Sequence, residues 1–302
     1  MTRPPALASP ATPLGERLRA SVPAGARRMA GGLRLRAATA SARWRPLPDT
    51  LIVGAMRAGT TSLFRWLSAH PLVDASVPKE VEFFSRHYAR GEAWYRGHFP
   101  LARWASNLPS RRVEATPDYL LDPRAPERAA RMLPEARILI LLRDPVERAW
   151  SHWWTMRRLG LEPLGFEAAL EAEAERLAPA WAELAADPEA ALPAAIRRYA
   201  YAGRSRYAEQ VQRWLDRYPR ERVMALKSED VYARPAEELK AVQAFLGLPA
   251  WQPPELARYE WDHRPPAERP RPSEALRARL RGELAGSIEP LAGLLGPAFR
   301  WS

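Results

Sequence analysis

The chain has 302 residues, of which 47% are hydrophobic and none is cysteine, and it carries a formal net charge of +11. This length suits one large domain or two small ones, and the hydrophobic content is sufficient for a buried core. The lack of cysteine excludes disulfides, thiolate metal sites and cysteine nucleophiles. The longest apolar runs, such as Ile138–Leu142, are too short to span a bilayer.

Most of the positive charge lies in the first 48 residues, which hold nine Arg and a single acid, Glu16. Subtracting these eight positive charges from eleven leaves about +3 for the rest, so we expect no nucleic-acid partner. Residues 1–48 are rich in Ala, Arg and Pro and are predicted to be a disordered leader. A transit peptide and a segment in weak contact with a membrane surface are the alternatives. We expect a cytoplasmic protein, peripheral to the membrane if the leader makes that contact.

Residues 49–302 are predicted to form a single α/β domain. Short apolar segments alternate there with longer helical ones, which is typical of a P-loop-like parallel sheet with helices on both faces. The expected strands are Thr50–Gly54, Arg112–Ala115, Arg137–Leu142 and Arg222–Lys227. The expected helices are Thr60–Ala69, Arg124–Met132, Pro145–Arg158, Phe166–Ala178, Ala190–Tyr199, Arg204–Arg217, Pro235–Leu246 and Glu274–Ala285. Pro145 and Pro235 suit the first helical turn, and Gly247 suits a helix C-terminus.

The sequence GAMRAGTTSL, which begins at Gly54, follows the first predicted strand. A strand, a glycine turn and a helix N-terminus form an anion site, because unpaired N–H groups and the helix dipole face the ligand. Gly54 and Gly59 have P-loop spacing, but Thr60 stands where a P-loop carries its Lys, so a single 5′-phosphate suits this loop better than a triphosphate. An ordinary turn with glycines for steric reasons is the alternative. The residues expected to bind are Arg57, Ala58, Gly59, Thr60, Thr61 and Ser62.

A second motif, RDPVERAWSHW, begins at the end of the third expected strand. Arg143 stands at that strand end, where ligands bind in parallel sheets, and Ser151 lies about two turns into the next helix. A guanidinium fork and a hydroxyl are suited to a second phosphate. The alternative for Arg143 is a capping ion pair with Asp144 or Glu147. Two phosphate sites without a magnesium-binding Asp indicate a nucleotide with separate 5′ and 3′ phosphates.

At this point the sequence resembles the sulfotransferases that use 3′-phosphoadenosine 5′-phosphosulfate (PAPS) and release 3′-phosphoadenosine 5′-phosphate (PAP). The resemblance is to the branch that contains the bacterial enzymes and the heparan sulfate sulfotransferases, and it covers roughly residues 50–302. The order of the motifs along one chain makes the match strong. They are GAMRAGTTSL, KEVEFFSRHYARGEAWYRGHFP, VEATPDYL, RDPVERAWSHW, RYAEQVQRWLDRYP, SEDVYARPAEELKAVQAFLGLP and LAGLLGPAFRW.

The resemblance implies a catalytic role for a Lys-Glu pair before two phenylalanines, here Lys79 and Glu80. Glu80 would be the base that takes the acceptor proton, and Lys79 would keep it ionised and touch the sulfuryl oxygens. Glu82 is the nearest rival base, and a surface ion pair is the structural alternative. Arg57 departs from the family, which usually has Lys there. Because Arg does not readily give up a proton, we expect it to act electrostatically.

A second departure is Ala115, which stands where the heparan branch has a Lys that faces the acceptor. This change disfavours a highly sulfated acceptor. Glu114 is expected either to orient active-site groups or to form a structural ion pair. The basic loop that covers the 3′-phosphate in the family corresponds to His263–Arg271, with Arg264, Arg269 and Arg271 as candidates. Three tryptophans near the motifs are candidates for the acceptor cleft, although core positions are more common: Trp94, Trp153 and Trp154.

The sequence thus predicts a sulfotransferase that moves the sulfuryl group from PAPS to a hydroxyl or amine of a glycan, glycolipid or small alcohol, without a metal. The five His have no metal-ligand spacing. A catalytically inactive nucleotide- or glycan-binding protein on the same scaffold is an alternative, which the departures at Arg57 and Ala115 keep open. A P-loop nucleotide kinase is disfavoured by Thr60 and by Arg143 before Asp144. The sequence leaves the acceptor and the oligomeric state open.

Overall fold

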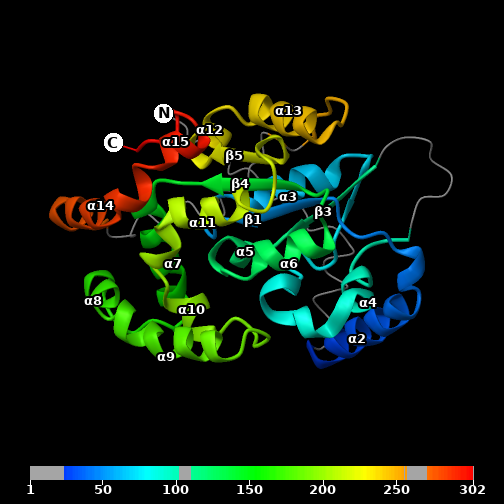
Figure 1. Cartoon of the computed structure of the whole chain (residues 1–302), viewed down its shortest axis with the longest axis horizontal. Coiled ribbons are helices and arrows are strands. Elements are labelled where there is room, and N and C mark those ends of the chain that lie inside the picture. Colours follow the sequence, from blue (N-terminus) through cyan, green and yellow to red (C-terminus); the bar gives the residue numbers. More distant parts are fainter. Residues whose placement is uncertain (1–23, 102–109, 255, 257–270, 302) are drawn as a thin grey trace, which may run out of the picture.

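The computed structural model describes residues 24–101, 110–254, 256 and 271–301. Its centre is a five-stranded sheet with the order β2-β3-β1-β4-β5, in which every neighbouring pair is parallel. The strands are β1 (Thr50–Gly54), β2 (Val73–Ala75), β3 (Arg111–Ala115), β4 (Arg137–Leu142) and β5 (Val223–Lys227). Because all strands run in one direction, the segments that follow them emerge at one edge of the sheet (Figure 1).

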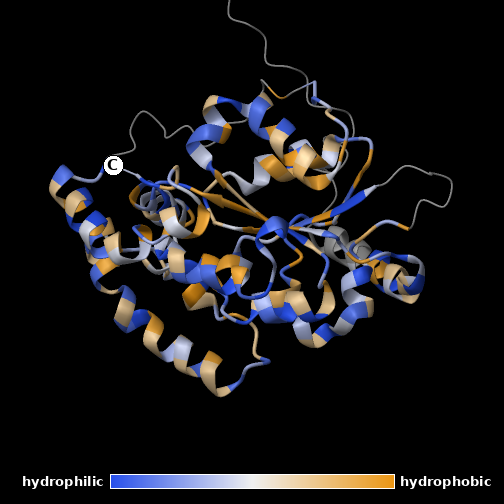
Figure 2. Ribbon diagram, turned by 45° about the horizontal axis from the view of Figure 1, so that its top comes forward, coloured by the Kyte–Doolittle hydropathy of each residue, from blue (hydrophilic) through white to orange (hydrophobic). Residues whose placement is uncertain are grey.

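The central strands form because their sequences are continuous apolar runs, as a sheet buried on both faces requires. Leu51, Ile52 and Val53 of β1 are completely buried, and so is Ile138–Leu142 of β4. Figure 2 shows the hydrophobic strands at the centre, with helices that alternate between hydrophilic and hydrophobic colours around them. The apolar helix faces therefore cover the sheet, and the polar faces meet solvent.

Helices lie on both faces of the sheet: α12 and α13 on one side, and α5 and α6 on the other (Figure 1). The longer helices are α2 (Ala24–Ala40), α3 (Thr60–Ala69), α6 (Ala125–Met132), α7 (Pro145–Arg158), α9 (Glu173–Ala186), α11 (Tyr207–Leu215), α13 (Pro235–Leu246) and α14 (Glu274–Ile288). The shorter ones are α4 (Gly91–Arg96), α5 (Asp118–Leu121), α8 (Phe166–Glu171), α10 (Ala194–Tyr199), α12 (Ser228–Ala233) and α15 (Leu291–Leu295). Single turns are η1 (Ala42–Trp44), η2 (Phe83–His87), η3 (Tyr88–Arg90), η4 (Gly203–Ser205) and η5 (Arg220–Arg222).

The predicted fold class is confirmed: the chain is α/β with a parallel sheet between helices. Five predicted elements have the observed bounds, namely β1, β4, α3, α7 and α13. The helix predicted over residues 166–178 is instead two helices, α8 and α9, and no Gly or Pro at the junction signals the break. The sequence analysis also missed β2, α4, α5, α12 and α15. Each of these five has six residues or fewer, which is too short for a periodic pattern to stand out.

Part of the segment predicted to be disordered is helical. Helix α2 packs on α4, where a Cβ at Gly97 would lie 3.1 Å from the Leu35 side chain. The Arg96 guanidinium donates to the Arg45 carbonyl at 2.6 Å, which joins the end of this segment to α4. Residues 24–48 therefore differ from the prediction, because close packing of small side chains leaves no strong apolar period in the sequence. Residues 1–23 lie outside the described residues, and the domain division stays a prediction.

Among the described helices, none has both the length and the apolar character that crossing a membrane requires.

The C-terminus of α13 provides a stability test with an internal control. Gly247 ends the helix with φ of 68°, a left-handed conformation that costs a Cβ-bearing residue energy. We expect Gly247→Ala to lower the free energy of unfolding by roughly 1 kcal/mol. Gly282 lies inside α14 with no atom within 4 Å of an added Cβ, so Gly282→Ala should raise it by about 0.5–1 kcal/mol. Chemical denaturation measures both, and a Gly247→Ala variant as stable as the wild type would contradict this view of Gly247.

Candidate active site

The loop after β1 leads directly into the N-terminus of α3, as the sequence predicts. Gly59 is the N-cap residue, has φ of 97°, and offers no side-chain oxygen to the first helical N–H groups. A Cβ at Gly59 would lie 2.7 Å from the Tyr232 hydroxyl, so only glycine fits there without movement. Thr60 is buried, Thr61 is exposed and Ser62 is half-buried. The helix N-terminus is therefore arranged as an anion site.

The same loop is braced by the segment that follows β5. The hydroxyl of the buried Ser228, the first residue of α12, donates to the Ala58 carbonyl at 2.5 Å. Tyr232 of the same helix reaches Gly59, as described above. Helix α12 thus fixes the backbone of the loop from the side opposite to β3.

Three polar side chains from two distant motifs meet beside this loop. Arg57 Nε donates to Ser151 Oγ at 3.1 Å, and Arg143 Nη1 donates to the Arg57 carbonyl oxygen at 3.4 Å. Burial, followed by repulsion from the Arg143 guanidinium, lowers the pKa of Arg57. Two guanidinium groups held so close together favour the binding of an anion, which would relieve their repulsion.

The structure also tests the capping alternative for Arg143. Asp144 is the N-cap of α7 and accepts a hydrogen bond from the Glu147 N–H at 2.8 Å. Arg143 Nη2 lies 3.9 Å from a carboxylate oxygen of Glu147, at the outer limit of an ion pair. A pair at this distance contributes little, about 0–1 kcal/mol. The cap is thus formed by Asp144, and the Arg143 side chain keeps the capacity to bind a ligand.

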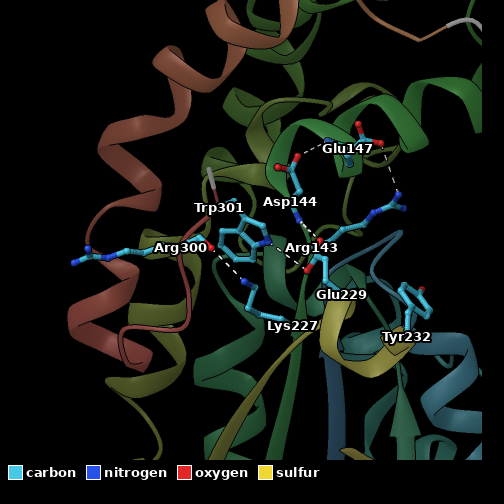
Figure 3. Close-up of a pocket in the computed structure, with 8 residues that line it drawn as sticks. All are labelled: Arg143, Asp144, Glu147, Lys227, Glu229, Tyr232, Arg300 and Trp301. Atoms are coloured by element: carbon cyan, nitrogen blue, oxygen red, sulfur yellow. Dashed lines mark hydrogen bonds and ion pairs between the residues drawn. The ribbon is translucent and has the colours of Figure 1, made fainter. Parts of the chain in front are cut away.

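A pocket of about 490 Å³ adjoins Arg143 at the carboxyl ends of β4 and β5 (Figure 3). The Trp301 indole lies in it, donates to a Glu229 carboxylate oxygen at 3.3 Å, and has the Lys227 ammonium 5.2 Å from its ring centroid. The other carboxylate oxygen of Glu229 accepts the Asp144 N–H at 2.8 Å. The lining residues are Arg143, Asp144, Glu147, Lys227, Glu229, Tyr232, Arg300 and Trp301.

Lys79 and Glu80, the predicted catalytic pair, lie after β2, at the same edge of the sheet. Lys79 Nζ donates to a Glu80 carboxylate oxygen at 2.7 Å, and the Glu80 side chain is 49% exposed. The rival base Glu82 is instead engaged by Arg86, four residues later. Glu80 is thus the more accessible of the two carboxylates. Within the described part of the chain, no hydrogen bond or ion pair joins Glu80 to Arg57.

Glu114, at the end of β3, is completely buried. Its carboxylate accepts hydrogen bonds from the hydroxyls of Tyr95, at 2.9 Å, and Thr116, at 2.5 Å. Burial raises the pKa of Glu114 to about 7, although hydrogen bonds from Thr116, Tyr95 and Tyr119 and the charge of Lys79 oppose this shift. Of the two expected roles for Glu114, the structural ion pair is absent, because its hydrogen-bond partners among the described residues are hydroxyls.

Residues 47–263 match the family described as the Sulfotransferase domain, which is more than half of the chain. The chain belongs to the sulfotransferase family. The structure of a sulfotransferase from Alicyclobacillus acidocaldarius superposes with a TM-score of 0.65 at 26% identity, over 85% of this chain and 100% of that one. The predicted family and the predicted fold are both confirmed.

Curated relatives of this sulfotransferase-family chain are much longer than it is. The bifunctional heparan sulfate N-deacetylase/N-sulfotransferase 1 of Caenorhabditis elegans is 27% identical over 70% of this chain, and human enzyme 1 of the same name is 32% identical over 67%. The chain spans 24% and 22% of their respective lengths. The similarity thus concerns one part of each relative.

For this sulfotransferase-family chain, the structure places most of the predicted site residues at one edge of the sheet, and their individual roles stay predictions. Arg264 and Arg269 lie outside the described residues, whereas Arg271 is described and exposed.

The tryptophans predicted near the acceptor cleft have different surroundings. Trp153 is buried against Trp150, with ring centroids 4.6 Å apart, which makes it a core residue. Trp94 and Trp154 are half-buried. Ala115 is buried at the end of β3. Across the described ranges, no three His, Asp or Glu side chains are grouped as a metal site.

Sequence reasoning missed four residues of this site: Ser228, Tyr232, Glu229 and Trp301. The first three belong to the motif SEDVYARP, which follows β5 directly. A stricter use of one rule would have found them, since residues that directly follow a strand of a parallel sheet lie at its ligand-binding edge. The rule does not find Trp301, which ends the motif LAGLLGPAFRW. Trp301 lies more than 70 residues after Glu229, to which its indole donates, and it follows no strand directly.

The raised pKa of Glu114 predicts a stability difference that depends on pH. Because the folded-state pKa of about 7 exceeds the usual value of 4.5, the contribution of Glu114 to stability is complete below pH 4.5 and is lost as pH rises through 7. Glu114→Gln does not titrate. We therefore expect the Tm of the wild type, relative to that of Glu114→Gln, to fall by roughly 5 °C between pH 5 and pH 8. Calorimetry at both pH values measures this shift, and an equal difference at both would show that the carboxyl titrates normally.

Proposed function

We propose that the chain transfers the sulfuryl group of PAPS to a hydroxyl or amine, with Glu80 as the base. The observation that carries this proposal is the contact between Arg57, in the loop before α3, and Ser151, beside Arg143 in the second motif. It joins two anion-binding elements at one sheet edge in a chain of the sulfotransferase family. PAPS has the matching chemistry, with one phosphate at each end of its ribose.

The first element suits the 5′-phosphosulfate. The N-terminus of α3 would donate backbone N–H groups to the phosphate, and the hydroxyls of Thr60, Thr61 and Ser62 lie in the same turn. Arg57 stays cationic near neutral pH and would stabilise the charge that develops on the leaving phosphate. PAPS supplies an activated sulfuryl group; these residues bind and orient it.

The second element suits the 3′-phosphate. Arg143 and Ser151 offer a guanidinium and a hydroxyl at the end of β4 and on α7. The adjoining pocket of about 490 Å³ falls in the size range of small-ligand sites, and it would take the nucleoside. Arg264 and Arg269, from the loop His263–Arg271 that the resemblance assigns to the 3′-phosphate, lie outside the described residues.

The same features disfavour a nucleoside triphosphate with magnesium. Thr60 is buried at the position where such loops carry Lys, so no ammonium is available for the β- and γ-phosphates. The carboxylate of Asp144, directly after Arg143, caps α7 and lies 3.6 Å from Arg281. It is therefore occupied with structural contacts and poorly placed to serve a metal.

Glu80 is proposed as the base because it is accessible and lies next to a cation. The Lys79 ammonium lies 2.7 Å from the Glu80 carboxylate, the group that would accept a proton from the acceptor. The proton would pass from the acceptor O–H or N–H to Glu80 as the new bond to sulfur forms and the bond between sulfur and the 5′-phosphate oxygen breaks, with its electron pair left on that oxygen. The PAP product would leave with its 5′-phosphate charge held by Arg57 and the α3 N-terminus.

For the acceptor, we propose a glycan, glycolipid or small alcohol. The named relatives act on heparan sulfate, which favours a glycan and includes an amine as acceptor. In contrast, Ala115 is buried and apolar where the heparan branch has Lys, which disfavours a highly charged acceptor.

The proposed roles predict a graded response in a sulfate-transfer assay with labelled PAPS. Arg57→Ala and Glu80→Gln should each lower kcat on the order of 100-fold, because one removes charge stabilisation and the other removes the base. Arg57→Lys, which keeps the charge, should retain at least about a tenth of the activity. Arg131→Ala, which removes an exposed guanidinium on α6, is the matched control and should change little.

Two outcomes would overturn these roles. Near wild-type activity of Arg57→Ala would remove Arg57 from the mechanism. An active Glu80→Gln beside an inactive Glu82→Gln would assign the base to Glu82. If PAP binds but the wild type labels no acceptor, the inactive binding scaffold becomes the better description.

A further inference from the structure

The segment that carries the proposed base is held at two backbone positions just after it. The N–H of Glu82 donates to Thr116 Oγ at 3.1 Å, and the N–H of Phe84 donates to the Tyr119 hydroxyl at 3.3 Å. Glu82 has φ of 54°, a left-handed conformation that is uncommon for a residue with a side chain. Such a conformation persists only where the surroundings hold it. The two hydroxyls are therefore among the groups that fix the turn after Glu80, together with the Arg86 and Arg128 guanidinium groups.

Both hydroxyls also contact Glu114. Thr116 donates to one carboxylate oxygen of Glu114, and the Tyr119 hydroxyl interacts with the same carboxylate. Above its pKa of about 7, the Glu114 carboxylate is ionised and only accepts hydrogen bonds, so each hydroxyl hydrogen then points toward Glu114. The oxygen lone pairs then face the N–H groups of Glu82 and Phe84. In its ionised form, the buried carboxylate thus sets the direction of both bonds to the turn.

Packing ties the same carboxylate to the residue between those two amides. Phe83 stacks on Tyr95, with ring centroids 4.2 Å apart and planes 6° from parallel. The Tyr95 hydroxyl donates to the second oxygen of Glu114 at 2.9 Å. Phe83, Tyr95 and Glu114 are all completely buried, so this arrangement has little freedom. Three successive residues of the turn are consequently held through Glu114.

We propose that Glu114 is a positioning residue for the transfer reaction: through Thr116, Tyr119 and Tyr95 it holds the turn that directs the Lys79–Glu80 pair toward the acceptor. This inference rests on the proposed function, because it assigns Glu80 as the base. Glu114 does not itself touch the donor or the acceptor. The groups that face it are the Tyr95 hydroxyl from α4, the Thr116 and Tyr119 hydroxyls from the segment after β3, and the Lys79 charge from the segment after β2.

The test uses the full chain and three substitutions with two readouts. Glu114→Gln keeps the shape but adds a donor, Thr116→Val removes the acceptor for the Glu82 N–H, and Thr116→Ser restores a hydroxyl. We expect the first two to lower kcat by about 10- to 100-fold, because small displacements of catalytic groups have effects of this size. The KM for PAPS and the affinity for PAP should stay within about two-fold, since the side chains proposed to bind PAPS, Arg57, Arg143 and Ser151, contact one another on the β4 side of the loop. Thr116→Ser should recover most of the activity.

The second readout is hydrogen exchange at the Glu82 and Phe84 amides, which does not require turnover. Exchange should accelerate about tenfold or more at both amides in Glu114→Gln, and at Glu82 in Thr116→Val. The matched control is Glu173→Gln. Glu173 is likewise buried and accepts hydrogen bonds from the N–H groups of Ala202 and Gly203, at 2.7 and 2.8 Å. Within the described residues, it has no hydrogen bond or ion pair with the turn. In the folded fraction, Glu173→Gln should leave kcat and the rate of hydrogen exchange at the Glu82 and Phe84 amides unchanged.

The outcomes separate this inference from the proposed function. A kcat of Glu114→Gln within two-fold of wild type, or unchanged exchange at both amides, would overturn the positioning role. An equal loss in Glu173→Gln would also overturn it, because any buried carboxylate would then serve. If the wild type transfers no sulfate at all, the proposed function fails, and the exchange rates alone decide whether Glu114 holds the turn.

Discussion

Strand β1 hydrogen-bonds to a parallel neighbour on each side, β3 and β4, and the position of every candidate site residue depends on this pairing. Since the strands share one direction, the loop before α3 emerges between the segment after β3 and the segment after β4. On one side, the turn after Glu80 contacts Thr116 through the N–H of Glu82. Arg143 and Ser151, the residues proposed to bind the 3′-phosphate, lie on the other side. The loop between the two sides would then place the donor next to the proposed base.

The two sides of the site differ in their electrostatics. On the β4 side, burial, followed by the charge of Arg143, lowers the pKa of Arg57, an arrangement that favours an anionic ligand. On the β3 side, one buried carboxyl has a raised pKa and its hydrogen-bond partners are hydroxyls. In the proposed function, the first side holds charge for the donor, and the second side holds geometry for the acceptor reaction.

Sequence reasoning identified the strongest elements and the motifs they carry. The strands β1 and β4 are continuous apolar runs, and α7 and α13 begin with Pro at a favoured position, so their bounds could be predicted. The contact between Arg57 and Ser151 could not, because it joins residues 94 positions apart and depends on how α7 leaves the sheet. Likewise, nothing in the sequence around Glu114 indicates that Tyr95, from a different helix, reaches its carboxylate. Helix α2 was missed because small residues pack closely without an apolar period.

The central claim is that the loop before α3 and the Arg143–Ser151 motif form one site for a nucleotide with separate 5′ and 3′ phosphates. Isothermal titration of the protein with PAP, beside ATP with magnesium, tests it most directly. PAP should bind at least about 100-fold more tightly than ATP with magnesium, and Ser151→Ala should weaken PAP binding. Equal or tighter binding of ATP with magnesium would contradict the claim.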